Sequence, residues 1–156
     1  MNFDIPNVAF TAEEWIARAS NPWNKGDAFT RLVHVQDGIA FATNRRRMHW
    51  GKTVFPDGTY DPASFTPTEF HGNHIPVFSE HLPDWAEFTD TRIGEIKNAS
   101  PGPEGEDVVH IVDEMYINKT WLLEAMNGNP FRLMIGPNRV AGVGSFGHFM
   151  IAQIKV

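Results

Sequence analysis

The feature that most constrains this chain is a capped helix joined to β-rich segments, and it occurs near both ends of the sequence. Thr11 and Glu14 have the spacing of a capping box, in which each side chain bonds to the other residue's backbone amide. Asn118 follows an apolar segment and precedes apolar residues at helical spacing, as an N-cap residue does. Such helices must bury their apolar stripe against neighbouring strands, so the pattern predicts an α+β fold with helices packed on antiparallel sheet.

The N-terminal half predicts one helix followed by a hairpin. Trp15, Ile16 and Ala19 form the apolar stripe, and Asn21-Pro22 ends the helix because proline disfavours helix at the preceding residue. Segments 30–36 and 39–43 are rich in β-forming residues and flank Asp37-Gly38, the pair typical of a tight hairpin turn.

The C-terminal half predicts the same order of elements. A strand over 108–112 and a second one over 115–117 lead through Asn118 into a helix that carries Trp121 and Leu122. Asn127-Gly128 closes that helix in the left-handed conformation that glycine favours. Strands are predicted over 131–135, 139–143 and 148–156, and the glycines between 141 and 147 serve turns and close packing. Trp15 and Trp121 are both expected in the core.

The two halves therefore form a weak internal repeat of strand, helix and strands, with segments 8–11 and 115–118 in corresponding places. The length of 156 residues fits a single domain over 1–156. Between the halves, about 56–106 is rich in Pro, Asp and Gly, which predicts an irregular connector.

The segments that define the halves resemble the bacterial DNA polymerase sliding clamp, the beta subunit. The likeness lies in 115–126, where a strand runs through an asparagine into a helix with paired leucines, and in the terminal segment 147–156. A second match lies in 31–46, which is similar to the family's hairpin with its glycine turn. The resemblance covers about half of the chain. It implies a single clamp-like domain, and the size suits a phage or prophage protein.

The resemblance implies that the chain is not an enzyme and carries no cofactor. Clamp rings surround duplex DNA with helices facing the hole, and their outer surface binds short peptides from polymerases and other partners. The family's terminal residues help to line that peptide groove, so the protein-binding candidates are Gln153, Ile154, Lys155 and Val156. The family has a proline where Gln153 stands.

Charge argues against a simple DNA-binding module, because the formal net charge is -6. The helix faces expected toward a ring hole are not basic, since they carry Glu13, Glu14 and Arg18 in the first helix and Lys119, Thr120 and Glu124 in the second. The nucleic-acid candidates are the basic cluster, Arg45, Arg46, Arg47 and Lys52. The alternative is that these residues are solvated or pair with acids.

Histidines suggest a second class of function. His71 and His74 lie close together in the connector and could hold a zinc or iron ion in a small metal-dependent enzyme. The pair lacks the helical spacing and the glutamate of the HExxH motif, and exposed loop histidines are the plainer interpretation. The absence of cysteine excludes disulfides and thiolate metal sites.

The sequence has no signal peptide and no apolar segment long enough to span a membrane, which predicts a cytoplasmic protein. We expect a non-enzymatic accessory or modulator of DNA replication that acts by self-association, by binding replication proteins, or by both; contact with DNA stays open. A phage structural or assembly protein is the third alternative.

Overall fold

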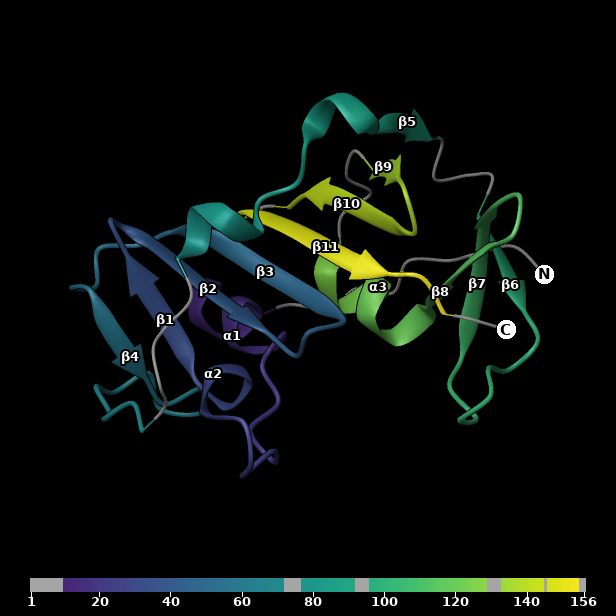
Figure 1. Cartoon of the computed structure of the whole chain (residues 1–156). Coiled ribbons are helices and arrows are strands. Elements are labelled where there is room, and N and C mark those ends of the chain that lie inside the picture. Colours follow the sequence, from purple (N-terminus) through teal and green to yellow (C-terminus); the bar gives the residue numbers. More distant parts are fainter. Residues whose placement is uncertain (1–9, 72–76, 92–95, 129–132, 145, 155–156) are drawn as a thin grey trace. The chain divides into compact units, whose positions relative to one another are not determined.

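The computed structural model describes residues 10–71, 77–91, 96–128, 133–144 and 146–154 (Figure 1). Its backbone contacts divide the chain into two compact units. The N-terminal unit holds α1 (Ala12–Ala17), α2 (Ala28–Arg31), β1 (Val33–Gln36), β2 (Ile39–Thr43), β3 (Arg47–Lys52), β4 (Gly58–Tyr60) and the 3-10 helix η1 (Phe78–His81). The C-terminal unit holds the 3-10 helix η2 (Trp85–Glu87), β5 (Thr89–Thr91), β6 (Lys97–Ala99), β7 (Val108–Val112), β8 (Met115–Asn118), α3 (Lys119–Met126), β9 (Leu133–Gly136), β10 (Arg139–Val143) and β11 (His148–Ala152).

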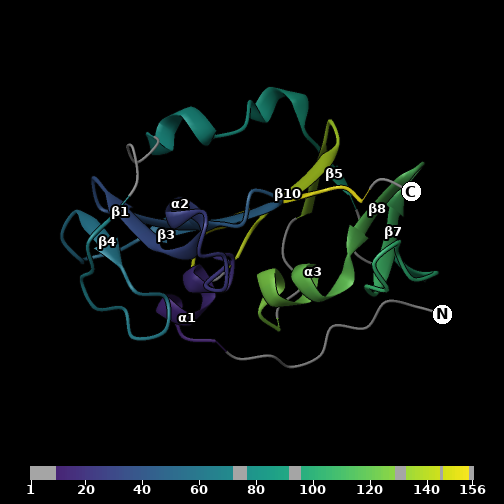
Figure 2. The same ribbon diagram turned by 60° about the horizontal axis from the view of Figure 1, so that its bottom comes forward.

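Helix α1 begins at the predicted capping box. The Glu14 amide donates to Oγ1 of Thr11 at 3.2 Å, and the Thr11 amide donates to Oε1 of Glu14 at 3.1 Å. Trp15, Ile16 and Ala19 are buried as expected. In the N-terminal unit α1 packs on one face of β2 and β3 (Figure 2).

The predicted strand over 30–36 is three residues too long at its start. Arg31 donates its amide to the Asp27 carbonyl at 3.1 Å, and the Thr30 hydroxyl donates to the same carbonyl at 3.2 Å. These local bonds extend the short helix α2 through Arg31, and β1 begins only at Val33.

The Asp37-Gly38 hairpin is confirmed. Gln36 pairs with Ile39, so the turn has two residues, and both have positive φ, 50° at Asp37 and 78° at Gly38. This is the geometry of a type I′ turn, which matches the twist of the two strands.

The predicted connector over 56–106 contains only short elements, the three-residue strands β4, β5 and β6 and both 3-10 helices. In the N-terminal unit β4 pairs antiparallel with β1, and the hydroxyl of Tyr60 donates to the Pro56 carbonyl at 2.6 Å. The strand order in this unit is β4-β1-β2-β3. Sequence composition missed β4 because a three-residue strand shows too little alternation.

In the C-terminal unit the predicted cap and helix are confirmed. Oδ1 of Asn118 accepts from the Trp121 amide at 3.1 Å, and Asn127 ends α3 in the left-handed conformation with φ 50°. Leu122 and Met126 are buried, whereas Trp121 is only half-buried and so is not the core residue expected.

Antiparallel strands make up the rest of the C-terminal unit. One group has the order β11-β10-β9-β5, and a separate three-stranded sheet has the order β6-β7-β8. Helices with antiparallel sheets confirm the α+β class. Residues 8 and 9 of segment 8–11, the first strand of the proposed repeat, lie outside the described residues, and residues 10 and 11 are not part of a strand, so the repeat stays a prediction. Within the described ranges, no helix is long and apolar enough to cross a membrane.

Two glycines of the N-terminal unit allow a close approach of two backbone segments. A Cβ added at Gly51 would overlap with the Phe146 carbonyl oxygen, and one added at Gly147 would overlap with the Trp50 carbonyl oxygen. Gly147 also has φ 155°, within the range that favours glycine. This agrees with the expectation that glycines near 147 serve close packing.

We predict that Gly51→Ala lowers the free energy of unfolding by about 1–3 kcal/mol, because the added methyl group meets backbone that cannot rotate away. Urea denaturation measures the change. Gly26→Ala is the matched control, because its Cβ would meet only Oδ1 of Asn24 at 3.6 Å. The control should be unchanged or gain up to about 1 kcal/mol. Equal stabilities of the two variants would contradict the close approach.

The N-terminal unit also buries two histidines. His49 on β3 has no exposed surface, its ring stacks on Trp15 with centroids 4.3 Å apart, and its Nδ1 lies 2.6 Å from the Trp15 carbonyl oxygen. Burial, and secondarily the charge of Arg47, lowers the pKa of His49 to about 3. Burial also lowers the pKa of His34 on β1, whose Nε2 lies 2.8 Å from the Phe29 carbonyl oxygen.

We predict that stability falls as the pH is lowered from about 6.5. In the unfolded chain His49 takes up a proton near pH 6.5, whereas in the folded chain it stays neutral until about pH 3. Between about pH 6.5 and pH 3 the unfolded state therefore binds more protons than the folded state. The free energy of unfolding falls by at most about 1.4 kcal/mol per pH unit for each such histidine. Urea unfolding between pH 7 and pH 5 measures the slope, which should become shallower in His49→Asn. Equal slopes for the unsubstituted protein and His49→Asn would show that His49 binds the same number of protons in the folded and unfolded states.

Candidate nucleic-acid and protein interfaces

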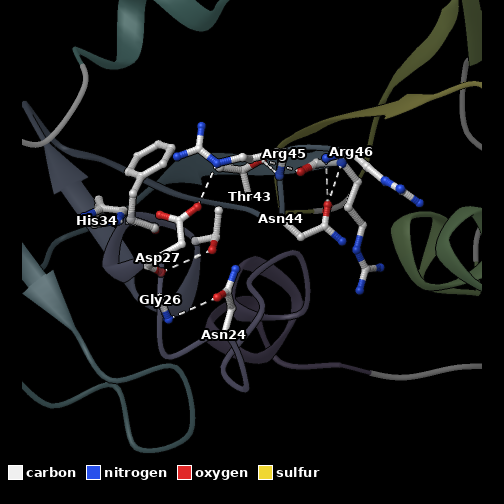
Figure 3. A network of polar contacts seen from close by, with 11 residues as sticks. Asn24, Gly26, Asp27, His34, Thr43, Asn44, Arg45 and Arg46 are labelled. Atoms are coloured by element: carbon white, nitrogen blue, oxygen red, sulfur yellow. Dashed lines mark hydrogen bonds and ion pairs between the residues drawn. The ribbon is translucent and has the colours of Figure 1, made fainter. Parts of the chain in front are cut away.

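The turn between β2 and β3 carries Arg45 and Arg46 of the predicted basic cluster, and Arg47 begins β3. Oδ1 of Asn44 accepts from the amides of Arg46 at 2.9 Å and Arg47 at 2.8 Å, and the Thr43 hydroxyl donates to the Arg47 carbonyl at 2.6 Å (Figure 3). Arg45 has φ 74° and donates its amide to Oγ1 of Thr43 at 2.9 Å. Short polar side chains therefore shape this turn from within.

Arg45 is tied to the loop before α2. Its Nε donates to Oδ2 of Asp27 at 2.7 Å, and its guanidinium lies 5.6 Å from the centre of the Phe29 ring (Figure 3). The hydrogen bond from Arg45 is the main reason why the pKa of Asp27 is lowered. The Arg45 side chain remains 63% exposed, so most of its N–H donors face solvent.

The structure does not bring all four nucleic-acid candidates together. Arg47 is buried, and its Nη2 donates to the Arg18 carbonyl at the end of α1. Lys52 is exposed but lies at the other end of β3, five residues after Arg47. At the rise of an extended strand this corresponds to about 17 Å. Only Arg45 and Arg46 are exposed side by side in sequence.

The predicted protein-binding residues fall partly in a groove of the C-terminal unit. This groove has a volume of about 880 Å³ and includes Gln153 and Ile154. Its other lining residues come from the β7–β8 hairpin and from β9 and the turn that follows it: Val112, Asp113, Glu114, Met115, Tyr116, Ile135 and Asn138. Lys155 and Val156 lie outside the described residues.

Backbone bonds fix the terminal segment along the groove. The Gln153 amide donates to the Asn138 carbonyl at 2.9 Å, and its side-chain Nε2 donates to Oδ1 of Asn138 at 3.1 Å. The Ile154 amide donates to the Tyr116 carbonyl at 2.8 Å. Gln153, at the position of the family's proline, therefore uses its amide N–H in a bond that proline could not make.

The other end of the groove is the β7–β8 turn. Asp113 has φ 49°, and Nε2 of His110 donates to the Asp113 carbonyl at 2.6 Å. The His110 ring lies against Tyr116, with ring centres 5.1 Å apart. Asp113 and Glu114 are exposed, so this end of the groove is acidic. Sequence reasoning missed these residues because only the fold places them beside the chain end.

The proposed metal pair is described only in part. His71 is exposed, and its Nε2 lies 3.4 Å from Oε2 of Glu69, which is exposed as well. His74 lies outside the described residues. The described residues contain no group of three or more His, Cys, Asp or Glu side chains that could hold a metal ion. The metal-dependent enzyme therefore stays a prediction.

One expectation about the helix faces is wrong. Glu124 is 7% exposed, so it belongs to the buried side of α3 and presents no charge to a ring hole. Glu13, Glu14 and Arg18 are exposed on α1 as predicted.

The structure also shows two further features: an exposed tryptophan, whose type suggests a partner surface when it is exposed, and an acidic residue that the sequence did not single out. Trp23, in the loop between α1 and α2, is 87% exposed. Asp27, in the same loop, is the partner of Arg45. The sequence gives a signal for the exposure of Trp23, because this aromatic residue stands among Asn, Pro and Lys residues. Nothing in the sequence links residues 27 and 45.

Comparisons with known proteins support the fold. No protein-family model matches the chain, and no curated protein sequence shows a significant match. Among solved structures, the chain is similar to DNA polymerase III subunit beta from Borrelia burgdorferi, determined in complex with a natural product, with a TM-score of 0.52 and 11% sequence identity. The match covers 100% of this chain and 65% of the length of that chain. At this identity the likeness shows the fold alone, and the fold of the chain is clamp-like.

Proposed function

We propose that this protein is a non-enzymatic accessory of DNA replication that binds a short segment of a replication protein. The observation that carries the proposal is the groove of the C-terminal unit, which includes two of the four residues that the clamp resemblance points to. The clamp-like fold supports the assignment to replication. No chemical reaction is part of this role.

The groove suits an extended peptide with an apolar side chain. Val112, Met115, Ile135 and Ile154 supply apolar lining, and the ring of Tyr116 adds an aromatic wall. Apolar anchors in such a site provide most of the binding energy, while backbone groups and polar side chains set orientation. The rigid attachment of Gln153 and Ile154 keeps the lining in place before the peptide arrives, which lowers the entropy cost of binding.

The proposed role also includes self-association in the cytoplasm. Within the described part of the chain, the end strands β5 and β6 each pair with a single neighbouring strand. Such strands can pair with a second copy of the chain. A phage or prophage origin stays a prediction drawn from the size of the chain.

We predict that Ile154→Glu weakens binding of a labelled peptide from a replicative DNA polymerase about tenfold or more. A charge placed in the apolar lining removes the anchor contact and must be desolvated when the peptide binds. Fluorescence anisotropy with the purified protein measures the dissociation constant.

Val54→Glu is the matched control for this variant, because Val54 is 99% exposed and does not line the groove. Its dissociation constant should equal that of the unsubstituted protein. Equal losses in both variants, or no loss in either, would count against the groove as the binding site.

We predict that the solution mass of the protein rises with concentration, because pairing of sheet edges is a concentration-dependent equilibrium. Light scattering on a sizing column measures it. A closed ring-sized oligomer of about six copies, the number of domains in a clamp ring, would support an encircling role. A monomer at every concentration would remove self-association and leave peptide binding as the function.

A further inference from the structure

Basic residues gather in one part of this acidic protein. Segments 18–31 and 44–47 contain six of its thirteen lysines and arginines but only one of its nineteen acidic residues. The sequence alone leaves these segments apart, separated by the β1–β2 hairpin.

Side-chain hydrogen bonds within the N-terminal unit join the two segments. Arg45 binds the carboxylate of Asp27, and Arg47 donates to the Arg18 carbonyl. Within the loop, Nη1 of Arg31 donates to the Lys25 carbonyl at 3.3 Å. The α1–α2 loop and the β2–β3 turn therefore form one basic surface, with Lys25, Arg31, Arg45 and Arg46 as its cations; we call it the loop–turn surface.

Trp23 projects from the same loop. The Asn24 amide donates to the Asn21 carbonyl at 3.1 Å, and the Asp27 amide donates to the Asn24 carbonyl at 3.3 Å. Oδ1 of Asn24 also accepts from the Gly26 amide at 3.2 Å (Figure 3). These consecutive turns place Trp23 in the same folded loop as Asp27, the partner of Arg45, and the Trp23 side chain is 87% exposed.

We propose that the loop–turn surface binds single-stranded nucleic acid, with Trp23 as a stacking platform for a base. An exposed indole ring can stack on any base, since every base has a π face, and neighbouring cations attract the phosphates on either side. Asp27 holds Arg45 in place through Nε alone, so the other N–H groups of the guanidinium can contact phosphate.

Duplex DNA fits this surface less well than a single strand. The bases of a duplex are stacked on one another, so a flat side chain on a protein surface reaches their faces only after the strand is opened. The contact also differs from the one that the clamp resemblance implies, in which helices face a duplex. The proposal does not depend on the groove or on peptide binding.

The experiment measures binding of a fluorescein-labelled twelve-nucleotide dT strand, the matching rU strand and a twelve-base-pair duplex by fluorescence anisotropy at low salt. Both single strands should bind more tightly than the duplex, with affinity that falls as salt rises. Trp23→Ala should weaken single-strand binding about tenfold, the size expected for loss of one stacked base. Lys25→Ala should weaken it and make the slope of log affinity against log salt shallower by about 0.7, the value for one phosphate contact on a single strand.

The matched controls are Trp85→Ala and Lys97→Ala, an exposed tryptophan and an exposed lysine of the C-terminal unit. Both should bind the strands as the unsubstituted protein does. The proposal is overturned if no strand binds, if the duplex binds as tightly as the strands, or if Trp23→Ala and Trp85→Ala behave alike. An acidic peptide is tested as a competitor. If it displaces the single strand and binds more tightly than the strand, the surface belongs to a protein partner and the proposal is overturned as well.

Discussion

The N-terminal unit depends on how strand β3 holds the end of helix α1. Helix α1 has six residues, and the last carbonyls of any helix lack partners within it. His49 bonds to the Trp15 carbonyl and Arg47 to the Arg18 carbonyl, so two side chains from one strand satisfy this end. The same His49 ring stacks on Trp15, so one side chain makes both a hydrogen bond and an aromatic contact with the helix.

This arrangement explains why a run of three arginines does not form one basic patch. Side chains alternate between the two faces of a strand, so Arg47 and His49 lie on the same face of β3. That face meets α1, which buries the Arg47 side chain and makes it part of the fold. Arg45 and Arg46 precede the strand, in a turn shaped by Asn44, and they stay exposed.

The two candidate surfaces have different chemistry and lie in different units of the chain. The groove has a mixed polar and apolar lining with an acidic end, and it is bounded by the terminal segment where that segment attaches to Asn138 and Tyr116. The loop–turn surface is basic and aromatic. Outside the segments that form it, acidic residues outnumber lysines and arginines, so the charge of the protein is unevenly distributed.

The sequence by itself determined the elements that rest on local chemistry. Thr11 and Glu14 fixed the start of α1, Asp37-Gly38 fixed the hairpin turn, and Asn118 fixed the start of α3, because each depends on atoms a few residues apart. Together with the resemblance to sliding clamps, these signals were enough to predict an α+β, clamp-like fold.

Only the tertiary structure decided which candidate residues reach solvent and which of them meet. Two contacts join residues that are distant in sequence: Asp27 pairs with Arg45, and Gln153 bonds to Asn138. The burial of Arg47 and Glu124 depends on which element packs against their side of the strand or helix. The physical reason is that a charged side chain is buried or exposed according to the element packed against it, and no local pattern in the sequence specifies that neighbour.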